Sequence, residues 1–271
     1  MLIFFKLKKT VLIFKNNRSL IYALLKREIL SRYKGSFLGI LWPFFLPLLM
    51  LGIYSFVFGI IFKPKWIELS ESRLDFSLLI FLGLIIFNLV AECLNKAPNL
   101  IVWNVSYVKK IVFPLEILPL VSMCSALFHA SISLLVWIAF YFSIYGRLNE
   151  TSILLPLVLL PLIILVVGIS WVLSSIGVYI RDISHVIGVA ISGLMFVSPI
   201  FYPLDSVPEK FRFIIQMSPI TIPIEMTRDI LYFGVIPSLR IYFLYLLISS
   251  AVAVMGYIFF QKTRKGFSDV L

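Results

Sequence analysis

Charged residues are scarce in this 271-residue sequence, at 14%, whereas hydrophobic residues make up 61% and the mean hydropathy is +1.05. Ordinary globular domains contain about 25% charged and about 45–50% apolar residues. A soluble core could not enclose this much apolar surface, so lipid must be the main solvent. No hydrophilic stretch is long enough to fold alone. We therefore expect one all-α integral membrane domain over residues 1–271 and no soluble catalytic domain.

Reactive motifs are also lacking. The sequence holds two cysteines and two histidines, with no CxxC pair and no metal-binding spacing. P-loop, HExxH and GxSxG motifs are absent as well. These absences exclude ATP hydrolysis by the P-loop route. We expect a chain that is not an enzyme and that binds no metal or cofactor itself.

Ionisable residues inside the apolar runs are few, the main ones being Glu92, Glu116 and His129. A proton-coupled carrier usually has charges deep in its bundle. The two glutamates instead lie near the ends of their runs, which weakens that interpretation. A rival hypothesis is an integral-membrane enzyme acting on lipid-linked sugars. It requires an essential residue among Glu92, Glu116, His129 and His185.

Long uncharged runs dominate the sequence. A helical span needs about 20 apolar residues, and six runs are long enough. The predicted spans cover about 37–62, 76–94, 115–146, 152–180, 186–204 and 239–261. A further apolar region within 205–238 is interrupted by Pro219 and Pro223, so it is too broken to span. We expect it to form an outer, periplasmic re-entrant helical hairpin between spans five and six.

The distribution of positive charge predicts the orientation. With six spans both termini lie on one side, and 16 of the 24 Lys and Arg residues fall on that side. The positive-inside rule then places both termini in the cytoplasm. The acidic residues balance the outer face, so the formal net charge of +11 lies on the inner face. There it faces anionic lipid heads, and we expect no nucleic-acid partner.

Residues 19–35 precede the first span and have an amphipathic pattern. Their apolar side would carry Ile21, Tyr22, Leu25, Ile29 and Tyr33, and their polar side Lys26, Arg27, Ser31 and Lys34. Glu28 and Arg32 intrude beside the apolar side as an i, i+4 pair that can partly neutralise itself. We expect a helix that lies in the inner membrane interface. The alternative is a basic flank without regular structure.

Residues 99–110 join spans two and three on the predicted cytoplasmic side. Their helical pattern mixes apolar, aromatic, amide and basic side chains: Asn99, Leu100, Trp103, Asn104, Tyr107, Lys109 and Lys110. An exposed aromatic-rich helix is typical of a docking surface for another protein. Trp and Tyr also favour the membrane interface, so an interfacial anchor is an equal alternative.

Two further groups of residues are candidates. Arg181 and Asp182 stand between spans four and five, which places them in a turn at the inner surface rather than in a buried reaction site. Asp182 could pair locally or cap the following helix. In span one, aromatic rings suited to the mixed faces of sugars could line a pathway. These pathway candidates are Trp42, Phe44, Phe45 and Tyr54.

Five stretches resemble one family, the permease subunits of type-2 ABC exporters of bacterial polysaccharides. They are 24–59, NVSYVKKIVFPLEILPL (104–120), GVYIRDISHVIGVAISGLMFVSPIFYP (177–203), SPITIPIEMTRDILYFG (218–234) and FQKTRKGFSDVL (260–271). The resemblance covers the chain after about Arg18. It is strongest to the O-antigen (lipopolysaccharide) exporter branch, with capsule and teichoic-acid exporters as near relatives.

This resemblance implies a homodimer of six-span subunits in the bacterial inner membrane, paired with two copies of an ATP-binding subunit. ATP and Mg would then be used by that partner. The cargo implied is an undecaprenyl-diphosphate-linked glycan. The resemblance also favours the first interpretation of 99–110, as a coupling helix that docks on the ATPase, with Arg181 and Asp182 as a second, shorter contact.

Overall fold

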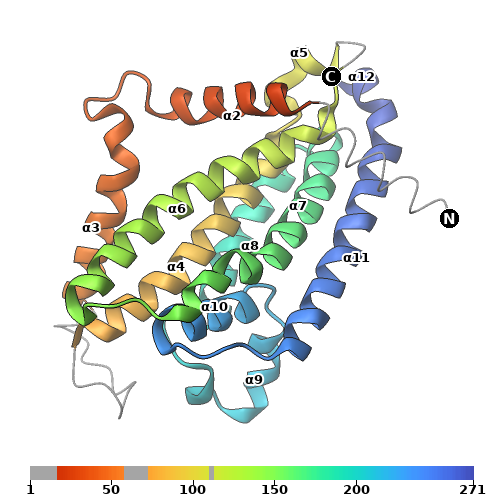
Figure 1. Cartoon of the computed structure of the whole chain (residues 1–271). Helices are drawn as coiled ribbons and strands as arrows, with labels where there is room; N and C mark the ends of the chain where they lie inside the picture. Colours follow the sequence, from red (N-terminus) through yellow and green to blue (C-terminus); the bar gives the residue numbers. More distant parts are fainter. Residues whose placement is uncertain (1–16, 58–72, 110–112) are drawn as a thin grey trace.

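The structure is a computed structural model that describes residues 17–57, 73–109 and 113–271 (Figure 1). Every regular element within these residues is helical, which confirms the all-α prediction. The longer helices are α2 (Arg18–Tyr33), α3 (Trp42–Phe56), α4 (Arg73–Lys96), α6 (Leu118–Tyr145), α7 (Leu155–Tyr179), α8 (Ile183–Val197), α9 (Glu209–Gln216), α10 (Thr221–Arg228) and α11 (Leu239–Thr263). Short elements are η1 (Gly39–Leu41), η3 (Ala97–Asn99), η4 (Val102–Asn104), α5 (Val105–Val108), η5 (Leu115–Ile117), η6 (Glu150–Leu154), η7 (Leu204–Ser206), the π-helix η8 (Asp229–Phe233), η9 (Arg264–Gly266) and α12 (Phe267–Val270).

Four of these helices are long and apolar enough to cross a membrane, namely α4, α6, α7 and α11 with their short extensions. They correspond to predicted spans two, three, four and six. The shorter apolar helices α3 and α8 occupy predicted spans one and five, with 15 residues each. At 1.5 Å per residue each is about 22 Å long, less than the hydrocarbon thickness of about 30 Å. The count of six spans therefore stays a prediction.

Helix α8 ends at Val197, short of the predicted boundary at 204. Ser198 precedes Pro199 and is extended, with ψ 151°. A residue before proline is disfavoured in the helical region because the proline ring clashes with it. The helix therefore ends seven residues before the predicted end of the span. The predicted end of span one, at 62, lies outside the described residues.

Helix α4 is the centre of the bundle. Every residue from Asp75 to Val90 is buried except Asn88. Around it, α7 and α11 approach closely where glycines face each other: a Cβ on Gly256 would lie 2.2 Å from the Gly168 carbonyl oxygen. Small residues of this kind let helix backbones pack tightly in membranes.

The predicted interface helix is present as α2, which lies across one end of the bundle (Figure 1). Its buried residue is Leu24, which packs with Ile117 and Val121. On the predicted apolar side, Ile21, Leu25, Ile29 and Tyr33 are half-buried and Tyr22 is 67% exposed. Ile21 and Leu25 pack beside Leu24 in this contact, so the side of α2 that faces η5 and α6 includes residues of the predicted apolar side.

The opposite end of the bundle carries α9 and α10, the two short helices expected within 205–238 (Figure 1). Buried Arg228 attaches α10 to the rest of the protein. Its guanidinium donates hydrogen bonds to the carbonyl oxygens of Leu79 (3.2 Å), Pro199 (2.7 Å) and Ile200 (2.9 Å). This end is therefore fixed to α4 and to the connection after α8.

Candidate functional site

The predicted docking segment lies at the same end of the bundle as α2 and α12 (Figure 1). It begins at η3, where Pro98 packs against α7. A Cβ on Gly177 would lie 1.9 Å from the Pro98 carbonyl oxygen, so the two backbones are in direct contact. Leu100 and Ile101 are buried behind this contact. The segment is thus anchored firmly to the bundle.

Trp103 is 66% exposed, and Lys109 is exposed as well. The predicted single helix over 99–110 is instead two short pieces, η4 and α5. Asn104 separates them with φ −119° and ψ 36°, and its amide donates to the Leu100 carbonyl oxygen at 2.9 Å. Lys110 lies outside the described residues. The anchored segment therefore presents an aromatic ring and a positive charge to its surroundings.

The side chains of Asn104 and Tyr107, both predicted coupling residues, face α2. Arg27 donates to the Tyr107 hydroxyl at 2.5 Å and to Asn104 Oδ1 at 3.5 Å. The Tyr107 ring is also stacked on Phe113, with centroids 4.2 Å apart. Half-buried Asn99 ends η3. These contacts join the docking segment to α2.

Arg181 and Asp182 are exposed in the turn between α7 and α8, as predicted for a surface turn. The Gly177–Pro98 contact near the end of α7 places this turn at the docking-segment end of the bundle. Asp182 makes no side-chain capping bond to α8 within the structure described, so the predicted cap is wrong. Its backbone is helical, with φ −71° and ψ −12°, rather than the extended form usual for a capping residue.

A cluster of charged side chains joins α2, α4 and α6, and sequence reasoning missed it. Glu92 on α4 contacts Arg32 at 2.5 Å, Lys96 at 2.9 Å and His129 at 3.0 Å. Lys96 also contacts Glu28 at 3.1 Å, and the Tyr33 hydroxyl lies 3.0 Å from His129 Nε2. We call Glu28, Arg32, Tyr33, Glu92, Lys96 and His129 the α2–α4 charge cluster.

The cluster corrects the expectation that Glu28 and Arg32 neutralise each other along the helix. Each pairs with α4 instead, and so α2 is held by ionic contacts as well as by Leu24. One signal was available in the sequence: Glu92 and Lys96 are spaced i, i+4 on a helix. Their partners on α2 and α6 could not be read from local spacing.

A groove of about 570 Å³ opens beside this cluster, between α3, α4 and α6. Its lining includes Arg32, Glu92 and His129 together with Asn88 and Tyr54. Of the four predicted pathway residues, Tyr54 alone lines this groove. Phe44 and Phe45 lie on the exposed side of α3 and Trp42 is partly exposed. The groove combines aliphatic walls with charged, hydroxyl and amide groups.

These features define a helical, multi-pass membrane protein whose predicted docking segment is anchored at one end of its bundle. Residues 19–232 match the family described as ABC-2 type transporter, and the chain belongs to that family. Membership of this family implies that the chain is a transport subunit of an ABC transporter, which also has an ATP-binding partner.

Several curated proteins are similar over most of their length. The chain is 27% identical to the O-antigen export system permease protein RfbA of Klebsiella pneumoniae, over 93% of this chain and 95% of that protein. It is 25% identical to RfbA of Myxococcus xanthus, over 71% and 72%. It is 26% identical to the polysialic acid transport protein KpsM of Escherichia coli, over 80% and 82%.

Proposed function

We propose that this chain is the permease subunit of an ATP-driven exporter that moves O-antigen polysaccharide, linked to undecaprenyl diphosphate, across the bacterial inner membrane. The observation that carries the proposal is the similarity to O-antigen export permeases along nearly the whole chain. The working unit would be a homodimer with two copies of an ATP-binding subunit, which uses ATP and Mg. This chain would bind no cofactor and catalyse no reaction.

The docking segment would pass the movement of the ATP-binding subunit to the spans. Trp103 and Lys109 would contact that subunit, and Leu100 would transmit the displacement because it is buried against the bundle. Exposed Arg181 and Asp182 would form the second contact. Asn104 and Tyr107 would act indirectly, since their bonds to Arg27 couple the segment to α2.

The proposed membrane placement has six spans, with α3 and α8 crossing together with their flanking residues. Both termini and α5 would face the cytoplasm, and α2 would lie in the inner interface. The end with α9 and α10 would face the periplasm as a re-entrant hairpin. Grouping of α2, α5 and α12 at one end of the bundle supports this placement (Figure 1).

Tyr54 and the groove beside the α2–α4 charge cluster would contribute to the cargo pathway. Its charged and amide groups suit a polar glycan or its diphosphate, and its aliphatic wall suits a lipid chain. Phe44, Phe45 and Trp42 would reach the pathway only across the proposed dimer interface, because they do not line this groove.

A second candidate cargo is capsular polysaccharide. The similarity to the polysialic acid transport protein KpsM over 80% of this chain favours it specifically. Teichoic acid is a third possibility, on resemblance alone. Deleting the chromosomal copy and analysing the surface glycans separates them, since loss of O-antigen with capsule intact supports the first proposal and the reverse pattern supports the second.

Co-purification tests the transport role directly. A tagged permease expressed with the ATP-binding subunit of its transporter should retain that subunit, and Trp103→Ala should weaken retention and export. Phe211→Ala is the matched control, because this exposed ring lies on α9 at the opposite end. A chain that exports without any ATP-binding subunit would overturn the proposal.

A further inference from the structure

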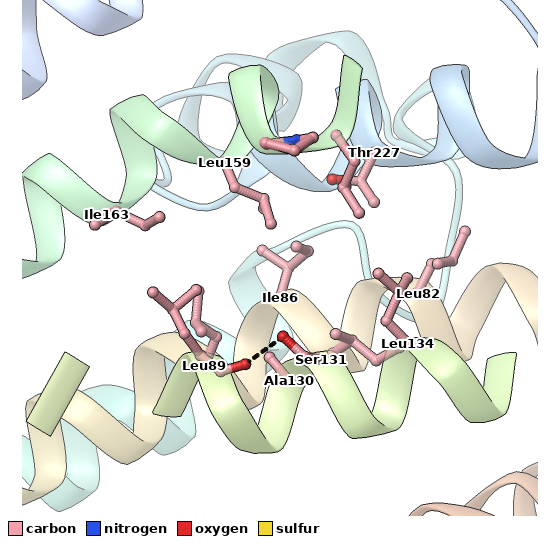
Figure 2. Close-up of a pocket in the computed structure, with 13 residues that line it drawn as sticks. Leu82, Ile86, Leu89, Ala130, Ser131, Leu134, Leu159, Ile163 and Thr227 are labelled. Atoms are coloured by element: carbon pink, nitrogen blue, oxygen red, sulfur yellow. Dashed lines mark hydrogen bonds between the residues drawn. The ribbon is translucent and has the colours of Figure 1, made fainter. Parts of the chain in front are cut away.

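An apolar cavity of about 370 Å³ lies between α4, α6, α7 and α10 (Figure 2). Its walls are mainly leucine and isoleucine side chains, such as Ile86 from α4, Leu134 from α6 and Leu159 from α7. No charged side chain is among the described residues that line it. The cavity is separate from the groove beside the α2–α4 charge cluster, because no lining residue other than Ile85 is shared.

Two hydroxyl groups face this cavity. Ser131 donates to the Leu127 carbonyl oxygen at 2.8 Å, the dashed line of Figure 2, so its hydroxyl is satisfied within its own helix. Thr227 is 2% exposed, and its Oγ1 has no hydrogen-bond partner among the residues that the structure describes. A buried hydroxyl without a partner is unfavourable, so an acceptor at this edge of the cavity would stabilise Thr227.

The surroundings of the cavity identify the occupant. Leu135 on α6 and Leu157 and Leu160 on α7 are exposed on either side of it, so these helices face lipid there. An apolar cavity of this kind excludes water. Its walls would lose dispersion contacts if it stayed empty. A hydrocarbon chain from the bilayer can fill it without crossing a polar barrier.

We propose that one acyl chain of a membrane phospholipid occupies this cavity, with its ester carbonyl oxygen accepting a hydrogen bond from Thr227. The inference depends on the chain's place in a membrane and not on the proposed cargo. A polyprenyl chain fits less well, because it carries no acceptor along its length and its diphosphate would meet no cation in the cavity lining. The lipid would then act as a structural part of the bundle, between α10 and the spans.

A photoreactive phospholipid tests the proposal. The full-length protein in phospholipid nanodiscs would receive trace phosphatidylcholine with a diazirine in one acyl chain, followed by irradiation and peptide mass spectrometry. We expect labelling concentrated on residues 127–134 of α6 and 155–163 of α7. Ala130→Phe should fill the cavity and abolish this concentration, whereas Ala190→Phe, at an exposed position of α8, should preserve it.

The hydrogen bond has its own test in the natural cavity. An ester phospholipid should compete for labelling about fivefold better than its ether analogue, which lacks the carbonyl. Thr227→Val keeps the side-chain volume and should abolish this preference, and Thr227→Ser should retain it. The proposal is overturned if labelling is uniform around the lipid-facing surface, if ester and ether lipids compete equally with the natural protein, or if a polyprenyl phosphate competes best.

Discussion

Arg228 is a single residue that holds α10 to α4 and to the connection after α8. Its guanidinium supplies donors to three backbone carbonyls from two separate parts of the chain, and it also contacts Glu225 at 2.9 Å. The side chain is 3% exposed. Arginine suits this site because its five donors lie in a rigid plane, whereas the lysine ammonium acts as a compact point donor.

We predict that Arg228→Met strongly destabilises the protein. The carbonyls of Pro199 and Ile200 would each lose this donor, at a cost of about 1–3 kcal/mol each, and Arg228→Lys should recover only part of the loss. The measurement is the thermal unfolding midpoint in detergent. Arg240→Met is the control, because Arg240 is exposed and its replacement should change stability by less than about 0.5 kcal/mol. Equal midpoints for the two methionine variants would show that the Arg228 contacts do not stabilise the fold.

Glu92 is the residue on which the α2–α4 charge cluster depends, since three basic groups converge on it. We predict that Glu92→Gln loosens α2. Arg32 and Lys96 would lose their shared counter-charge, and Arg32 is half exposed, so a modest loss of about 1–1.5 kcal/mol is expected. Amide hydrogen exchange over α2 should then be about tenfold faster.

Exchange in α11 serves as the internal reference for that experiment, and Glu150→Gln as the control, because Glu150 is exposed at the α9 and α10 end. Unchanged exchange in α2 after Glu92→Gln would mean that Leu24 and its apolar neighbours hold the helix without the charges. The distant partners of Arg228 and of Glu92 could not be predicted from the sequence, for the same reason. Their partners lie as far as 149 residues away, and no local period records such contacts.

Elements were easier to predict than their contacts. Helix existence follows from long apolar runs, so α4, α6, α7 and α11 appear close to their predicted bounds. The helix ends depended on local chemistry, as with Pro199 after α8. The mixture of Trp and Lys with apolar residues predicted a helical docking segment over 99–110. Its division into η4 and α5 was not predicted, because Asn104 bonds back to the Leu100 carbonyl instead of continuing one helix.

The contact between α7 and η3 gives a prediction at this scale. Gly177→Ala would force the end of α7 away from Pro98, since a Cβ would lie 1.9 Å from the carbonyl oxygen. We expect a lower unfolding midpoint and a clear loss of export, because the docking segment would move relative to the spans. ATPase activity of the complex and surface glycan are the functional measurements.

Gly188→Ala is a matched control for this substitution. Gly188 lies in α8 with no atom within 4 Å of an added Cβ, among the residues described. There alanine should stabilise the helix by about 0.5–1 kcal/mol relative to glycine. If Gly177→Ala behaves like Gly188→Ala, the close approach of α7 and η3 is not needed for stability or coupling.

At the scale of the whole molecule, the structure separates two chemically different ends. One carries α2, the docking segment, the Arg181 turn and α12, and the other carries α9 and α10 (Figure 1). The predicted spans and the positive-inside rule grouped the same segments, since 16 of the 24 Lys and Arg residues fall on the side of the two termini. The charge distribution could assign each segment to one side of the membrane. It could not tell whether the 15-residue helices α3 and α8 cross the membrane.

Cysteine accessibility decides that question. On a background with Cys93→Ala and Cys124→Ala, single cysteines would be placed at exposed positions and treated with a membrane-impermeant maleimide in intact cells. We expect Glu150→Cys and Ser206→Cys to react, and Ser31→Cys, Ser106→Cys and Asp182→Cys to react only after permeabilisation. These positions are all exposed in the structure, so access depends on the side of the membrane.

Each pair of positions brackets particular helices. If Asp182 and Ser206 are found on opposite sides of the membrane, α8 crosses it although the helix has only 15 residues. If Ser31 and Ser106 are found on the same side, the chain crosses the membrane an even number of times between them. Helix α3 must then cross if α4 does. If Ser206→Cys is protected in intact cells while Glu150→Cys reacts, α8 returns to the inner face and the six-span orientation is wrong. The docking segment would keep its side in that case, since Ser106 precedes both α7 and α8.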